Sequence, residues 1–141
     1  MKRFLLLLIT IALAAPLFAD PQPSPGEDPL AQFLFPPELL MAHQQELHLQ
    51  DQQKATIKAE VGKAQARFFD LQWQMNEESG KLAALLAAPQ LDEAKVLEQA
   101  DKVMGLEREI KRTHLSLLIR LRNLLTPEQA AAMGAIRRSG K

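Results

Sequence analysis

Residues 57–85 read IKAEVGKAQARFFDLQWQMNEESGKLAAL, and this stretch decides the fold. Its apolar residues recur at alternating steps of four and three, which is the spacing of a helix that buries a narrow seam against a second helix. Glu78 is the one break in the series. The stretch therefore predicts a long helix with a helical partner. The apolar members of the seam are Ile57, Val61, Ala64, Phe68, Leu71, Met75, Leu82 and Leu85.

A second stretch with the same spacing follows after the short connection at residues 89–91. Here Glu107 and His114 are the breaks. Because so short a connection forces two helices to lie antiparallel, we predict an all-α fold built on a long antiparallel helical hairpin. Its helices should cover residues 51–88 and 92–124, with Asp92 as the N-cap of the second. The second seam contains Val96, Ala100, Val103, Ile110, Leu117, Leu121 and Leu124.

Short helices are predicted on both sides of the hairpin, one at residues 37–47 and one after Thr126. The string Leu125-Thr126-Pro127-Glu128-Gln129 combines a hydroxyl N-cap, a proline at the first helical position and a glutamine that can close a capping box. A degenerate copy, Leu49-Gln50-Asp51-Gln52-Gln53, stands before the hairpin. Since Gln50 replaces the capping threonine there, we expect Asp51 to supply the cap.

The N-terminal residues are typical of an exported protein. Lys2 and Arg3 precede an apolar run of about a dozen residues, which is a signal-peptide pattern and is shorter than the roughly 20 residues that span a bilayer. We predict a signal peptide at 1–19, a Pro-rich flexible lead at 20–36, a helical domain at 37–138 and a tail at 139–141. The expected location is the periplasm, without stable membrane insertion once the signal is removed. An uncleaved inner-membrane anchor is the alternative, because Leu17 is not the small residue that signal peptidase prefers.

Composition excludes several classes of function. The chain has no cysteine, which rules out disulfides, thiolate metal sites and cysteine nucleophiles. Removal of the signal leaves 15 basic and 17 acidic residues, and a net charge of −2 favours no nucleic-acid partner. A Gly-rich phosphate loop, a nucleophile elbow and an HExxH motif are all missing from the sequence. We therefore expect a protein that is not an enzyme.

Histidines and carboxylates are the candidate metal ligands. His114 occupies a seam position, Glu60 should lie about one turn from it across the hairpin, and His43 could fold back toward the same end. Such a set without thiolates suits zinc, nickel, cobalt or copper(II). The alternative is that His114 is a core histidine bonded to Glu60 or to a carbonyl, with His43 and His48 exposed.

A second apolar face is predicted outside the seam. Phe69 and Trp73 stand four residues apart and share one side of their helix. A single seam gives a thin core, so this face is expected to be buried in a homodimer or under the first helix. The functional alternative is an exposed surface for unfolded client proteins. The off-seam residues of the second long helix are Leu97, Met104, Leu115 and Leu118.

An LTxxQ string and its degenerate copy at the two ends of a helical hairpin, in a short exported chain, resemble the Spy/CpxP family of periplasmic proteins. That family includes zinc-resistance-associated proteins and heavy-metal sensors, and the resemblance covers about residues 37–138. It implies two hairpins interlocked in a curved homodimer. Some members hold unfolded envelope proteins without ATP, whereas others regulate a membrane-bound sensor kinase or anti-sigma partner. Metal-sensing members bind zinc, nickel or cobalt through histidine and glutamate.

The resemblance leads to two functional hypotheses. The first is a non-enzymatic protein of the envelope stress or heavy-metal response that holds unfolded proteins or regulates a signalling partner. The second is a periplasmic heavy-metal sensor, for which the resemblance implies His43, Glu60 and His114 as ligands. Leu118 follows His114 where that branch is expected to have methionine, which departs from the metal-sensing pattern.

Overall fold

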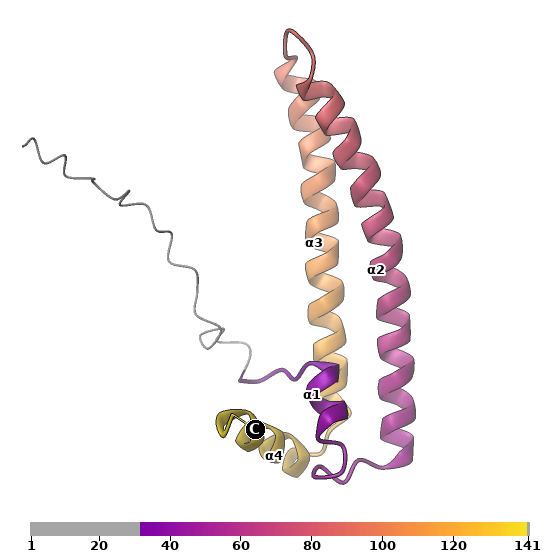
Figure 1. Cartoon of the computed structure of the whole chain (residues 1–141), viewed down its shortest axis with the longest axis vertical. Helices are drawn as coiled ribbons and strands as arrows, with labels where there is room; N and C mark the ends of the chain where they lie inside the picture. Colours follow the sequence, from indigo (N-terminus) through magenta and orange to yellow (C-terminus); the bar gives the residue numbers. More distant parts are fainter. Residues whose placement is uncertain (1–31, 141) are drawn as a thin grey trace, which may run out of the picture.

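The computed structural model describes residues 32–140, and the regular structure in this part of the chain is helical. α2 (Asp51–Leu86) and α3 (Glu93–Asn123) form an antiparallel hairpin, while α1 (Pro37–Ala42) and α4 (Pro127–Arg138) gather at the end opposite the turn (Figure 1). We call this end the base of the hairpin. The predicted all-α hairpin with short flanking helices is confirmed. The predicted signal peptide, residues 20–31 of the lead and residue 141 of the tail lie outside the described residues.

The first helix is shorter than the predicted 37–47. After α1 the chain makes a further turn, in which the Leu47 amide donates to the His43 carbonyl at 3.0 Å. His48 then adopts the left-handed conformation with φ 49°, and the Leu49 amide donates to the Gln44 carbonyl at 3.0 Å. This is the helix stop that glycine usually occupies, and it redirects the chain into α2.

The N-caps of the long helices were predicted with one error. The Asp92 carboxylate accepts from the Lys95 amide at 3.2 Å, so the predicted cap of α3 is confirmed. At the start of α2, however, Gln50 is the N-cap and Asp51 is already helical. The Gln53 side-chain oxygen accepts from the Gln50 backbone amide at 2.9 Å. A residue of the first helical turn thus caps the start of α2, and Asp51 has no capping role.

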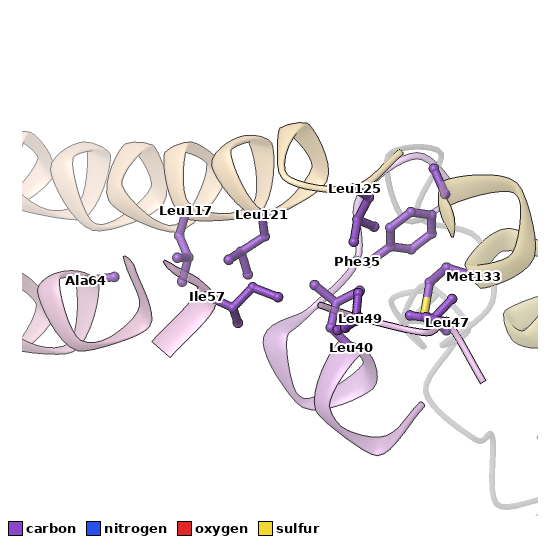
Figure 2. Packing of buried hydrophobic residues seen from close by; sticks show 11 residues of the cluster. Phe35, Leu40, Leu47, Leu49, Ile57, Ala64, Leu117, Leu121, Leu125 and Met133 are labelled. Carbon is purple, nitrogen blue, oxygen red and sulfur yellow. The ribbon is translucent and has the colours of Figure 1, made fainter. Parts of the chain in front are cut away.

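The hydrophobic core lies at the base, where the hairpin meets the flanking segments. Side chains of α2 and α3 point toward one another there, and Phe35, Leu40 and Met133 cover the end of the hairpin (Figure 2). In the described part of the chain, Leu71 is the one buried apolar residue outside this cluster. The half of the hairpin toward the turn therefore has only a thin apolar seam. The cluster contains Phe35, Leu40, Leu47, Leu49, Ile57, Ala64, Leu117, Leu121, Leu125, Ala130 and Met133.

Two polar positions depart from the predicted seam. His114 is exposed, and Thr113 beside it is the half-buried residue of that turn. In the thin half, Gln99 is 6 % exposed and donates to the Glu78 carbonyl at 2.9 Å and to the Glu78 carboxylate at 2.6 Å. Glu78 breaks the apolar series of α2, yet it joins the two long helices through these hydrogen bonds.

Within residues 32–140, no helix has the length and apolar content that crossing a membrane requires.

Candidate functional site

The most exposed aromatic surface of the hairpin is a pair on α2. Phe69 and Trp73 are 68 % and 67 % exposed, and their ring centroids lie 6.3 Å apart at an interplanar angle of 31°. The four-residue spacing brings the rings together because side chains at i and i+4 are neighbours on a helix. Both rings lie outside the seam with α3. We call this pair the aromatic patch.

α3 presents a second row of exposed apolar side chains, with Leu97, Met104, Leu115 and Ile119 between 41 % and 55 % exposed. Successive members are separated by 7, 11 and 4 residues, which are close to whole numbers of helical turns. They therefore share one side of α3, and we call them the α3 ridge. Leu118, which the sequence placed with this group, is instead half-buried.

Charge is distributed unevenly along the hairpin. The half toward the turn, residues 70–102, carries seven acidic and three basic residues. The half toward the base, residues 51–67 and 107–123, carries four acidic and nine basic residues. Because the two long helices are antiparallel, like charges from both helices fall in the same half. The hairpin thus has a net charge of −4 near its turn and +5 near its base.

Glu60 faces α3 near the base, where its carboxylate is engaged by two cations. It accepts from the Lys63 ammonium at 2.8 Å and from the Arg120 guanidinium at 3.0 Å, and its side chain is 15 % exposed. The hydrogen bond from Lys63, followed by that from Arg120, lowers the pKa of Glu60 below its ordinary value. Both carboxylate oxygens of Glu60 are thus engaged by cations, which disfavours a metal ion at this position.

The two histidines of the predicted metal site have separate surroundings. His43 Nδ1 lies 3.0 Å from a carboxylate oxygen of Glu46, one turn along the chain. The exposed His114 lies beside Phe68, with ring centroids 6.5 Å apart. Within residues 32–140, no three histidine, aspartate or glutamate side chains form a group that could hold a metal ion. One chain in this conformation therefore does not bring His43, Glu60 and His114 together, and the donor set does not fit a resident metal.

The string at residues 125–129 and its degenerate copy at residues 49–53 meet at the base through Gln129 and Gln53. The Gln53 side-chain amide donates to the Gln129 side-chain oxygen at 2.8 Å, and the Gln129 side-chain amide donates to the Gln53 side-chain oxygen at 3.1 Å. Gln53 also donates to the Leu124 carbonyl at 2.8 Å, and Gln129 donates to the Leu47 carbonyl at 3.1 Å. Each side-chain oxygen additionally caps its own helix. The strings thus fasten the start of α2 to the end of α3.

The other residues of the second string complete the start of α4. The Thr126 hydroxyl accepts from the Gln129 backbone amide at 3.2 Å, and the Gln129 side-chain oxygen accepts from the Thr126 backbone amide at 3.0 Å. The predicted capping box is therefore confirmed. Pro127 takes the first helical position and Leu125 is buried in the core. Hydrogen bonds from its own amide and from Thr126 lower the pKa of Glu128, which suits a carboxylate at a positive helix start.

The sequence alone did not indicate a basic groove on the base half of the hairpin. Arg67 of α2 and Arg112 of α3 both line this groove. The two residues are 45 positions apart, so no local pattern links them. The concentration of basic residues near the end of α3 was the one signal that pointed to this region.

Comparison with known families agrees with the helical hairpin. The family model described as heavy-metal resistance matches residues 4–132, which is most of the chain. No curated protein and no solved structure matches the chain. The matched range contains both long helices and the start of α4. The chain therefore belongs to the heavy-metal resistance family.

Proposed function

We propose that this chain is a non-enzymatic periplasmic protein of the heavy-metal or envelope stress response, and that it holds unfolded proteins on its aromatic patch. The observation that carries the proposal is the exposure of Phe69 and Trp73 at about two thirds of their surface. Aromatic side chains of this kind are usually buried, because each offers on the order of 150–250 Å² for contact. Two neighbouring exposed rings favour a binding surface.

The chemistry of the patch suits clients of varied sequence. Burial of apolar surface is non-directional, so it requires no particular partner sequence. Polar neighbours at Asp70, Gln72 and Gln74 separate the rings from further apolar surface on α2. An interaction limited to two rings buries a small apolar area, which suits binding that is released without ATP.

The proposed assembly is a homodimer in which two hairpins pair antiparallel, with the turn of each beside the base of the other. Its support is the uneven charge of the hairpin, since this arrangement sets the acidic half of each chain against the basic half of the other. A two-fold axis would repeat the same contact twice. The α3 ridge supplies apolar surface for the interface, which leaves the aromatic patch for clients. The link to the Spy/CpxP branch, with its interlocked curved dimers, belongs to the same proposal.

The test is suppression of aggregation of a reduced, unfolded client at near-equimolar ratio without ATP. The variant Phe69→Ser/Trp73→Ser should lose this activity while keeping its helicity and its oligomeric state. Leu86→Ser/Leu91→Ser is the matched control, because it removes two exposed apolar residues near the turn and should retain activity. If the aromatic variant unfolds or monomerises, the patch is structural and the proposed client site is wrong.

The second candidate is a periplasmic metal sensor, favoured by membership of the heavy-metal resistance family. His43, Glu60 and His114 are the candidate ligands for zinc, nickel, cobalt or copper, and their use requires a rearrangement or a ligand from a second chain. Calorimetry should then give micromolar or tighter binding that His114→Ala abolishes. The absence of heat with all four metals at neutral pH would remove this candidate. A membrane-bound sensor or anti-sigma partner would receive the signal.

A further inference from the structure

A groove of about 280 Å³ runs along one side of the hairpin near its base. Its floor contains the buried side chains of Ala64 and Leu117. Thr113 and Ser116 add two hydroxyl groups from α3. Ala64, Thr113 and Ser116 have small side chains, which leave space between the long helices that larger residues would fill. The remaining lining is charged and consists of Glu60, Lys63, Arg67, Glu109, Arg112 and Arg120.

The charges of this groove are only partly compensated. Lys63 and Arg120 both pair with Glu60, at 2.8 Å and 3.0 Å. Among residues 32–140, by contrast, Arg67 and Arg112 have neither an ion pair nor a hydrogen bond through their guanidinium groups. Glu109 contributes the second negative charge of the lining, so four basic and two acidic side chains leave a net charge of +2.

The two uncompensated guanidinium groups come from opposite helices. Arg67 belongs to α2 and Arg112 to α3, and both line the same groove. Like charges that share a groove repel one another, and the repulsion is relieved when an anion enters between them. The planar fork of each guanidinium is matched to the oxygens of a phosphate or a carboxylate.

We propose that this groove binds a phosphate monoester dianion between Arg67 and Arg112, with the hydroxyls of Thr113 and Ser116 as further hydrogen-bond donors. A dianion neutralises the net charge of +2. Its three terminal oxygens can serve two guanidinium forks and a hydroxyl together, whereas a carboxylate offers only two oxygens. The open side of the groove leaves room for the esterified group. Inorganic phosphate, a soluble phosphate ester and a phosphorylated lipid headgroup share this chemistry.

The experiment titrates the full chain with inorganic phosphate and follows binding by calorimetry. The variant Arg67→Gln/Arg112→Gln should weaken binding at least tenfold. Arg108→Gln/Arg122→Gln is the matched control, since it removes the same charge from α3 outside the groove, and it should change the affinity less than twofold. Circular dichroism checks that both variants keep their helicity. No heat with millimolar phosphate, or equal weakening by both variants, would overturn the proposal.

A second arm distinguishes the sources of the phosphate. Vesicles of phosphatidylcholine with phosphatidic acid are sedimented with the chain, with and without inorganic phosphate as competitor. Vesicle binding that phosphate displaces and that only the Arg67→Gln/Arg112→Gln variant loses supports a lipid headgroup. Binding of phosphate without vesicle binding supports a soluble ligand. Vesicle binding without any binding of inorganic phosphate contradicts the proposal, because general surface charge then explains it.

Discussion

Gln53 and Gln129 form a reciprocal amide pair across the base of the hairpin, although they lie 76 positions apart in the chain. Each amide donates to the other, donates once more to a backbone carbonyl and accepts from the N-cap of its own helix. The donors and acceptors of both side chains are therefore in use. The string at residues 125–129, whose pattern is that of a local helix start, therefore also joins two distant parts of the chain.

The hydrogen-bonded pair of Gln53 and Gln129 predicts non-additive effects on stability. Gln129→Ala should lower the free energy of unfolding by about 2 kcal/mol or more, because it removes one of the two acceptors of the Gln53 side-chain amide and the side-chain donors and acceptors that serve the Leu47 carbonyl and the Thr126 backbone amide. Gln53→Ala should cost a similar amount. The double variant should cost less than the sum, since either single change already breaks the pair. Urea unfolding of the four proteins measures this coupling, and additivity within about 0.5 kcal/mol would show that the pair is not coupled.

The left-handed residue before α2 predicts a stabilising substitution. His48 has φ 49°, a conformation that costs a residue with a Cβ roughly 1–2 kcal/mol relative to glycine. His48→Gly should therefore raise the free energy of unfolding by about 1 kcal/mol. Gln44→Gly, an exposed position in the same turn, should lower it. Thermal unfolding checks both variants, and a loss of stability in His48→Gly would mean that the imidazole makes a contact of its own.

Two glycines inside α2 predict a further gain in stability. Beyond the neighbouring residues and the backbone of its own helix, a Cβ added at Gly62 or Gly80 meets nothing within 4 Å. Because glycine in a helix interior costs about 0.5–1 kcal/mol relative to alanine, Gly62→Ala and Gly80→Ala should each stabilise the chain by that amount. Gly140 has φ 68°, so Gly140→Ala should bring no gain. If either α2 variant is destabilised at concentrations where the chain self-associates, that glycine lies in the dimer interface.

The polar link between the long helices predicts a pH dependence. Hydrogen bonds from Lys81 and then from Gln99 hold the pKa of Glu78 below its ordinary value of 4.5. The carboxylate therefore stabilises the fold fully above pH 4.5, and this contribution disappears as the pH falls through the lowered folded pKa. Glu78→Gln should be less stable at pH 7 and lose less stability on acidification to pH 3. Glu109→Gln is the control for a solvated carboxylate, and equal pH profiles for the two variants would contradict the prediction.

The hairpin could be predicted from the sequence because its determinants are local. Seam spacing, the turn at 89–91 and the caps at Asp92 and Thr126 each depend on residues within a few positions of one another. The predicted burial of His114 was wrong because a step of three from Ile110 reaches Thr113 and a step of four reaches His114, and the spacing alone does not choose between the two. In the structure Thr113 takes the half-buried place instead. The end of α1 was also missed, since the helix ends at Ala42 and residues 43–48 continue as hydrogen-bonded turns, which the sequence pattern does not distinguish from a helix.

The candidate sites were less predictable because they depend on long-range pairs. The aromatic patch could be read from the sequence, since Phe69 and Trp73 are four residues apart on one helix. The separation of His43, Glu60 and His114 could not, because Glu60 pairs with a cation 60 positions away. Whether the aromatic patch contacts a second copy of the chain or an unfolded client depends on a molecule outside this structure. A solution measurement has to make that choice.

Trp73 provides the most direct measurement of the central claim, because it is the one tryptophan in a chain without tyrosine. Its fluorescence therefore reports on the aromatic patch without labelling. We predict a red-shifted emission of exposed indole that does not change with protein concentration. An unfolded client without tryptophan should shift this emission to the blue and saturate near equimolar ratio. A blue-shifted emission that depends on the chain's own concentration and does not respond to the client would contradict the account, because the patch would then be a dimer interface.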